Sequence, residues 1–199
     1  MSSDWSSDVC SSDLYVKGRF DETDTLHFFI NHWPSRYGGY LASQPKRDHA
    51  ASILKGKVDS LFGIDPKSKI MIMGDFNDGP SDNSILNVLQ AGANASENDI
   101  LLLINLMKPF EDDQTTGTLK YRQSWDVFDQ FIVSAIFMVP DTGFQISGGK
   151  AFIYNHDFLF EEDERYLGRK PFRTFYGFDY LGGFSDHLPV YIDLLKSSE

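Results

Sequence analysis

The sequence predicts an α/β protein in which layers of β-sheet are flanked by helices. In the first half of the chain, strand-like and helix-like patterns alternate. The second half consists of short strand-like runs with turn-rich segments between them. No internal repeat or linker divides the 199 residues, and one globular domain can account for this length.

The composition excludes several classes of protein. Hydrophobic residues make up 41% and charged residues 24% of the chain, which is typical of a soluble folded domain. A formal net charge of −11 argues against nucleic-acid binding through a broad basic surface, but not against an enzyme that reaches one phosphate through a metal ion. No apolar run approaches the roughly 18 to 20 residues of a membrane helix. The single cysteine, Cys10, permits no intrachain disulfide.

Residues 1–14 differ from the rest of the chain. They repeat Ser-Ser-Asp three times and have neither a regular strand or helix period nor the features of a signal peptide. They can be read as a flexible acidic leader or as translated sequencing-adapter sequence, and we favour the second interpretation. We therefore expect residues 1–14 to be a non-native or disordered leader and residues 15–199 to be globular.

The first predicted elements are two strands of a hairpin, 15–20 and 25–31, around a polar turn. Residues 46–62 carry apolar side chains at helical spacing, and residues 70–73 form a short buried strand. A further helix, capped by Ser81 or Ser84, is expected to run to Leu89.

The second half begins with a predicted helix over residues 99–107 that ends before Pro109. Four strand-like runs follow it, with turn-rich segments between them, at residues 118–121, 127–133, 152–154 and 189–194.

Three polar clusters stand where apolar strands end or begin. They are Asn31-His32-Trp33 after LHFFI, Asp75-Phe76-Asn77 after IMIM, and Ser185-Asp186-His187 before LPVYIDLL. Strand-end residues of α/β proteins gather at one rim of the sheet, where their functional sites usually lie. Each cluster alone also has an ordinary explanation, because an aspartate after a strand often belongs to a turn.

Together, four motifs resemble the endonuclease/exonuclease/phosphatase superfamily, which includes deoxyribonuclease I, abasic-site endonucleases, neutral sphingomyelinases and inositol polyphosphate 5-phosphatases. In chain order they are NHWPSR at 31–36, GDFN at 74–77, DQFIVS at 129–134 and SDHLPV at 185–190. The resemblance extends over about residues 15–195. It implies a deoxyribonuclease I-like sandwich of two packed, mostly antiparallel sheets flanked by helices. It also implies metal-dependent hydrolysis of a phosphodiester, with Mg²⁺ or Mn²⁺ as cofactor and nucleic acid as the favoured substrate. No protein partner is inferred from it.

The resemblance implies a role for each matching residue. Asp75 would orient or deprotonate the attacking water, and Asn77 would position the phosphate and Asp75. His187 would contact the phosphate, with its ring fixed by Asp129 as in other Asp–His pairs. Asp186 would be a metal ligand, because Mg²⁺ prefers oxygen ligands.

Further residues are candidates for substrate contacts. His32 corresponds to the second site histidine of the deoxyribonuclease branch, and the amide of Asn31 beside it is a candidate phosphate contact. Arg36 and Arg173 are candidate charged contacts, although both can equally be solvated surface arginines. The aromatic segment 166–184 is either a stacking wall for a base or apolar group, or part of the core.

One part of the family pattern has no counterpart here. The family's principal metal ligand is a glutamate from an early strand, usually accompanied by an asparagine from the first strand. Their absence agrees with an N-terminal truncation, which would make residues 15–199 the C-terminal portion of the domain and the chain weakly active or inactive. Two alternatives stay open: a phospholipid or other small phosphodiester hydrolase, and an inactive fragment with only a binding or structural role. The sequence leaves the cellular location undetermined.

Overall fold

The computed structural model describes residues 12–20, 24–92, 103–113, 115–140 and 143–196. Most of the predicted leader, residues 1–11, lies outside this range. The part of the predicted helix 99–107 that precedes residue 103 lies outside it as well.

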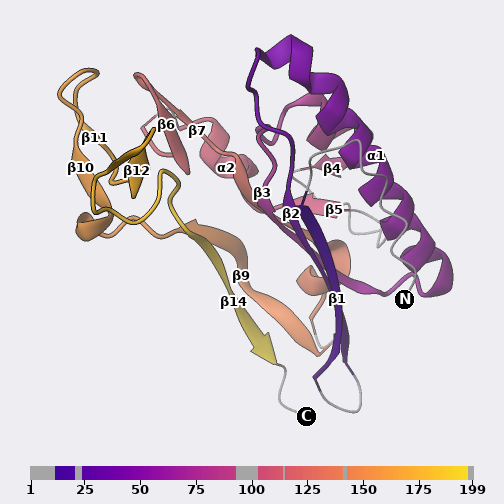
Figure 1. The fold of residues 1–199 in the computed structure, drawn as a ribbon. Coiled ribbons are helices and arrows are strands. Elements are labelled where there is room, and N and C mark those ends of the chain that lie inside the picture. Colours follow the sequence, from indigo (N-terminus) through magenta and orange to yellow (C-terminus); the bar gives the residue numbers. More distant parts are fainter. Residues whose placement is uncertain (1–11, 21–23, 93–102, 114, 141–142, 197–199) are drawn as a thin grey trace.

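The centre of the molecule is a six-stranded mixed sheet (Figure 1). β1 and β2 form the predicted antiparallel hairpin, β2 pairs with β3 in parallel, and β3 pairs with β8 antiparallel. In spatial order the strands are β1 (Ser12–Arg19), β2 (Thr25–His32), β3 (Lys69–Asp75), β8 (Asp129–Ser134), β5 (Leu103–Asn105) and β4 (Ala91–Gly92).

Helix α1 (Tyr40–Ile64) makes the crossover that joins the parallel strands β2 and β3. It begins six residues before the predicted start at residue 46, and Pro45 lies within it. The prediction missed these first turns because the apolar residues at helical spacing begin only at Ala50. Its buried side chains Leu54, Val58 and Phe62 follow one another at four-residue spacing and face the sheet.

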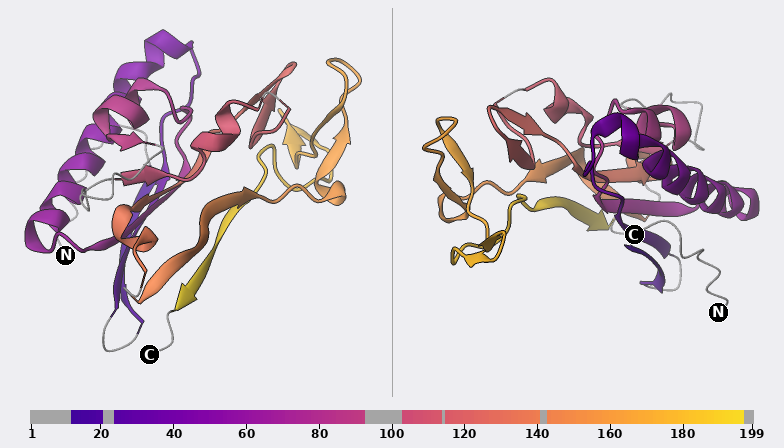
Figure 2. Two further views of the ribbon diagram at one scale, coloured as in Figure 1. Left: turned by 180° about the vertical axis from the view of Figure 1, so that it is seen from behind. Right: turned by 45° about the horizontal axis from the view of Figure 1, so that its top comes forward.

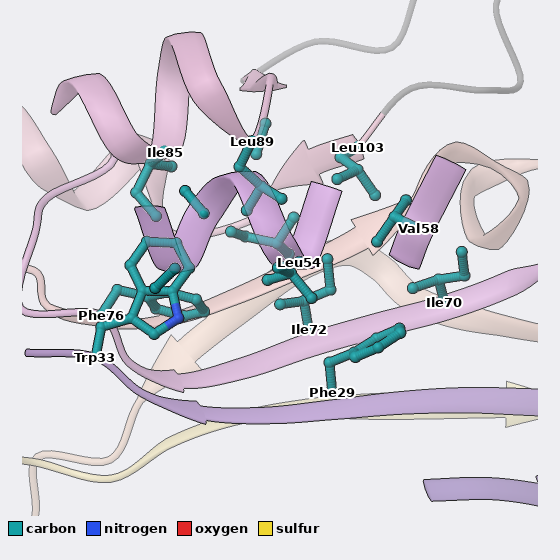
Figure 3. Packing of buried hydrophobic residues seen from close by; sticks show 14 of the residues in the cluster. Phe29, Trp33, Leu54, Val58, Ile70, Ile72, Phe76, Ile85, Leu89 and Leu103 are labelled. Carbon is teal, nitrogen blue, oxygen red and sulfur yellow. The ribbon is translucent and has the colours of Figure 1, made fainter. Parts of the chain in front are cut away.

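The space between α1 and the sheet holds one of two hydrophobic cores (Figure 3). Phe29 from β2, Ile70 and Ile72 from β3, and Leu54 and Val58 from α1 all contribute to it. Each aliphatic side chain that is fully buried in this way stabilises the fold by about 1.5–3 kcal/mol.

The opposite face of the sheet is covered by a second layer, an antiparallel pair of β9 (Phe144–Ile153) and β14 (Val190–Lys196). Figure 2 shows this pair on the side of the sheet away from α1. The second core lies between this strand pair and the large sheet, and it contains Met71 of β3, Phe131 of β8 and Ile146 of β9. The predicted fold class, layered α/β with mostly antiparallel sheets, is confirmed.

Three two-stranded hairpins and a short helix project beyond the rim of the large sheet where β3 ends and β8 begins (Figure 1). The hairpins are β6 (Leu119–Tyr121) with β7 (Ser124–Asp126), β10 (Phe160–Glu162) with β11 (Arg169–Pro171), and β12 (Phe175–Tyr176) with β13 (Asp179–Tyr180). The helix is α2 (Lys108–Glu111). Single 3-10 turns occur at η2 (Ala135–Met138) and η3 (Asp157–Leu159).

Two predicted helices differ from the structure. The prediction over 99–107 is wrong from residue 103, because Leu103, Ile104 and Asn105 are buried and pair with β8 as β5. The segment after Ser81 forms the short π-helix η1 (Ser84–Val88), and neither predicted serine caps it. The hydroxyl of Ser84 instead donates a hydrogen bond to Asp78 at 2.6 Å. None of the described helices has both the length and the apolar character needed to cross a membrane.

Candidate active site

Three of the predicted site residues stand side by side at the rim of the large sheet. Asp75, the last residue of β3, is paired in register with His32 of β2 and with Asp129 of β8. Nε2 of His32 lies 3.7 Å from Oδ2 of Asp75. The sheet thus brings together residues from three of the four sequence motifs.

His187 joins this row from the segment that leads into β14. Its Nδ1 lies 2.6 Å from Oδ2 of Asp129. A bridge between His187 and Leu119, together with the hydrogen bond from the Leu188 amide to the Thr118 carbonyl, holds the backbone in place. Burial opposes the charged imidazolium, but the hydrogen bond and the negative charge of Asp129 raise the pKa of His187 above its ordinary value.

Asn77 holds the carboxylate of Asp75. Its backbone amide donates to Oδ1 at 2.8 Å, and its side-chain amide donates to Oδ2 at 3.3 Å and to the Trp33 carbonyl at 3.0 Å. Asn77 has a φ of 51°, a left-handed conformation that asparagine tolerates better than most residues. Burial raises the pKa of the Asp75 carboxyl, whereas the nearby His187 and the Asn77 amide counteract this shift.

Gly74 allows the close approach of β2 and β3 beside Asp75. Its φ is +132°, and a Cβ atom at this position would lie 1.9 Å from the carbonyl oxygen of Asn31. Only glycine fits such a contact without displacement of the backbone. The glycine of the GDFN motif therefore allows β2 and β3 to pair closely just before His32 and Asp75, which are paired in register.

Asp186 lies next to His187 and is half-exposed. Nη2 of Arg173 lies 3.7 Å from its carboxylate, and the guanidinium of Arg173 is also 5.7 Å from the ring centre of Tyr176. Among the described residues, no three His, Cys, Asp or Glu side chains are grouped to hold a metal ion. Asp186 provides an oxygen ligand suited to Mg²⁺, but the described residues alone do not make a complete metal site.

Two predicted substrate contacts have partners inside the protein. The side chain of Asn31 is buried, donates to the Phe29 carbonyl at 3.1 Å and accepts from the Trp33 indole at 3.3 Å. Arg36 donates from Nε to the Asn77 carbonyl at 2.8 Å. Its guanidinium lies between two aromatic rings, 4.7 Å from the centre of Tyr40 and 4.4 Å from that of Phe128.

A buried charge network below the GDFN loop was not predicted. Asp78, interpreted from sequence as a turn residue, is fully buried, and Nε of the equally buried Arg47 lies 2.8 Å from its Oδ1. Arg36 reaches both Asp78, at 3.2 Å, and Asp82, at 2.6 Å. Arg47 stands among charged helix residues, a pattern typical of a solvated face, so the sequence contains no local signal of its burial.

The aromatic segment 166–184 is not part of the core. Phe175, Tyr176, Phe178 and Tyr180 are all more than half exposed, and Phe178 at the tip of the β12–β13 hairpin is fully exposed. Of the two interpretations given for this segment, the core interpretation is therefore wrong.

The two layers of β-sheet, with α1 covering the outer face of the larger one, form a deoxyribonuclease I-like fold. A family model described as "Endonuclease/Exonuclease/phosphatase family" matches residues 4–196. The chain belongs to this family. A search of the curated proteins finds no match to the sequence.

Solved structures share this fold at low sequence identity. A humanized D. rerio TDP2 has a TM-score of 0.52 and 13% identity, with 93% of this chain and 61% of that chain covered. A functionally unknown conserved protein from Enterococcus faecalis has a TM-score of 0.51 and 10% identity, with 93% and 56% covered. An endonuclease/exonuclease/phosphatase family protein from Bacteroides thetaiotaomicron has a TM-score of 0.50 and 17% identity, with 88% and 52% covered. The chain thus spans between half and two thirds of the length of these proteins.

Proposed function

We propose that this protein hydrolyses phosphodiesters and that nucleic acid is its favoured substrate. The observation that supports this most is the row of His32, Asp75 and Asp129 at one sheet rim, to which His187 is joined at 2.6 Å. These side chains match the chemistry that such a reaction requires: a base for water, a ring to contact the phosphate, and a carboxylate that orients the ring.

In this proposal Asp75 orients the attacking water and accepts its proton. The two hydrogen bonds from Asn77 fix the carboxylate, so that its position is set before substrate binds. Asp129 holds Nδ1 of His187, which leaves Nε2 as the ring atom for a phosphoryl oxygen. His32 lies beside Asp75 on the β2 side, 3.7 Å from its carboxylate, and is assigned to the leaving-group oxygen.

The remaining predicted residues divide into two groups. Arg173 stays a candidate substrate contact, because its guanidinium is partly exposed and lies beside Asp186. Asn31 and Arg36 are assigned a supporting role, because their polar atoms bind Trp33 and Asn77 inside the protein.

A divalent cation, Mg²⁺ or Mn²⁺, belongs to this proposal, with Asp186 as one ligand. When bound, such an ion supplies positive charge to the phosphoryl oxygens. It would need oxygen ligands in addition to Asp186, because Mg²⁺ favours six-fold coordination. We therefore expect slow turnover by this chain.

The test is hydrolysis of a single-stranded oligonucleotide and of a p-nitrophenyl phosphodiester, with Mg²⁺ or Mn²⁺ and with chelator. His187→Ala and Asp75→Asn should each lower the rate by about a hundredfold or more. His49→Ala, which changes an exposed histidine of α1, is the matched control and should retain full activity. Activity that persists in His187→Ala, or that chelator leaves unchanged, would contradict the assignment.

The exposed rings of the β12–β13 hairpin favour one alternative substrate, the phosphodiester of a lipid head group. Release of phosphocholine from sphingomyelin vesicles, without cleavage of the oligonucleotide, would support it. No turnover of any of these diesters would support the third interpretation, an inactive module.

A further inference from the structure

A buried threonine connects the two chain segments that carry the Asp129–His187 pair. Asp129 begins β8 and His187 precedes β14, so the pair joins the two layers of the fold. Thr118, the residue before β6, is fully buried and makes hydrogen bonds to the backbone of both segments. It takes no direct part in the chemistry proposed above.

The hydroxyl of Thr118 holds the start of β8. Its Oγ1 accepts hydrogen bonds from the backbone amides of Phe128 and Asp129, both at 3.1 Å. A hydroxyl oxygen has two acceptor lone pairs, so this one side chain can satisfy both amides. The Phe128 carbonyl in turn accepts from the Phe76 amide at 2.9 Å, which connects the same backbone to the residue after Asp75.

The backbone of Thr118 holds the segment of His187. The Thr118 carbonyl accepts a hydrogen bond from the Leu188 amide at 2.7 Å. The next residue along the chain, Leu119, forms a bridge with His187. Thr118 therefore fixes both segments at once, and the 2.6 Å contact between Asp129 and His187 depends on the separation of these segments.

Gly117 allows Thr118 to lie this close to the chain that leads into β8. A Cβ atom at this position would lie 2.6 Å from the Asp126 carbonyl oxygen and 2.9 Å from Cβ of Trp125. The Thr118 amide donates to the same carbonyl at 2.8 Å. The two segments are thus in direct backbone contact, which keeps the Thr118 hydroxyl within reach of β8.

We propose that Thr118 is a positioning residue for the Asp129–His187 pair, because its hydroxyl places Asp129 and its carbonyl places His187 at the separation that the pair requires. The inference rests on the proposed function of His187, since Thr118 affects the rate only through that ring. A displacement of about 1 Å can slow a reaction by about a hundredfold, so a small shift of either segment is enough. Thr118 is fully buried and does not contact the substrate itself.

Removal of the hydroxyl tests the proposal through hydrolysis of the p-nitrophenyl phosphodiester with Mg²⁺. Thr118→Val keeps the branched shape of the side chain but leaves the amides of Phe128 and Asp129 without their acceptor. We expect kcat to fall by about tenfold to a hundredfold, with a smaller effect on KM. Thr118→Ser restores the hydroxyl and should retain most of the rate.

Ser134→Ala is the matched control. Ser134 ends β8 at the opposite end from Asp129, and its buried hydroxyl accepts from the Ile70 amide and donates to the Ser68 carbonyl, both at 2.9 Å. Its loss should also lower the stability of the fold but leave kcat unchanged. A loss of kcat in Ser134→Ala as large as in Thr118→Val would indicate a general effect of stability and would overturn the proposal.

Proton NMR measures the pair without relying on turnover. A hydrogen bond of 2.6 Å should move the resonance of the His187 Nδ1 proton far downfield. We expect this resonance in the unchanged protein, in Thr118→Ser and in Ser134→Ala, and its loss or upfield movement in Thr118→Val. If Thr118→Val does not fold, hydrogen exchange of the unchanged protein replaces it: the Phe128 and Asp129 amides should exchange as slowly as those within β8. Exchange as fast as at exposed amides would overturn the proposal.

The two measurements separate this proposal from the proposed function. Unchanged kcat in Thr118→Val, in a protein that loses activity in His187→Ala, would overturn the positioning role and leave the proposed function. A protein without diesterase activity whose Nδ1 resonance still requires the Thr118 hydroxyl would refute the proposed function and leave the positioning role. Absence of this resonance from the unchanged protein would overturn the geometry of the pair and the proposal with it.

Discussion

The buried pair of Asp78 and Arg47 gives the most direct test of how the GDFN loop is held. Both side chains are fully buried, and Asp78 also accepts a hydrogen bond from Ser84 at 2.6 Å. Asp78→Asn keeps the size of the side chain but leaves the guanidinium of Arg47 without its countercharge. Removal of one partner of a buried ion pair costs about 3–5 kcal/mol. In a domain of this length, that loss lowers the melting temperature by roughly 6–20 °C.

Urea unfolding followed by circular dichroism measures this loss. The control is Asp59→Asn, which breaks the more exposed pair of Lys55 and Asp59 on α1 and should cost only about 0.3–0.5 kcal/mol. A cost for Asp78→Asn that is no greater than for Asp59→Asn would refute the reasoning. If Asp78→Asn does not fold, the double variant Arg47→Met/Asp78→Leu, which removes both charges, should still fold. Its failure to fold would contradict the charge argument.

Three further predictions concern other parts of the structure. Burial lowers the pKa of His27 below its ordinary 6.5, so around this pH the unfolded chain binds more protons than the folded protein. The free energy of unfolding should therefore fall as pH falls through about 6.5. The urea midpoint should decline less between pH 7.5 and 5.5 in His27→Gln than in the unchanged protein. Gly74→Ala should cost more than about 2 kcal/mol, because its Cβ would meet the Asn31 carbonyl, while Gly92→Ala, with open space around its Cβ, should be close to neutral in the same unfolding assay. Asn77→Ala and Asn77→Gly should both slow diester hydrolysis. Thermal melts should show Asn77→Gly to be about 1 kcal/mol more stable than Asn77→Ala, because alanine, unlike glycine, is strained at a φ of 51°.

The strands that carry the site were predictable because their patterns are local. The predicted strands 25–31 and 70–73 fall within β2 (Thr25–His32) and β3 (Lys69–Asp75), and each runs into a polar cluster that marks its end. β5 was missed because an apolar run such as Leu103–Asn105 fits a helix equally well. What makes it a strand is the pairing with β8, which lies far along the chain.

The site itself was only partly accessible to sequence reasoning. Family motifs identified Asp75, Asp129 and His187 as candidates, and the structure brings all three to one rim. The burial of Asp78 and Arg47 could not be predicted from the sequence, because a charged side chain is expected at the surface unless its partner is known. That partner comes from another segment, and no local pattern reveals it.

The strand that ends at Asp75 is enclosed on both sides, with Ile70 and Ile72 in one core and Met71 in the other. An inserted or deleted residue within β3 would exchange the side chains that face the two cores and shift Asp75 out of line with Asp129. The β12–β13 connection, residues 177–178, is exposed and has no such constraint from two sides. Length changes should therefore be tolerated unevenly along the chain, and a scan of single-residue insertions for soluble yield should find losses in 69–75 and tolerance in 177–178.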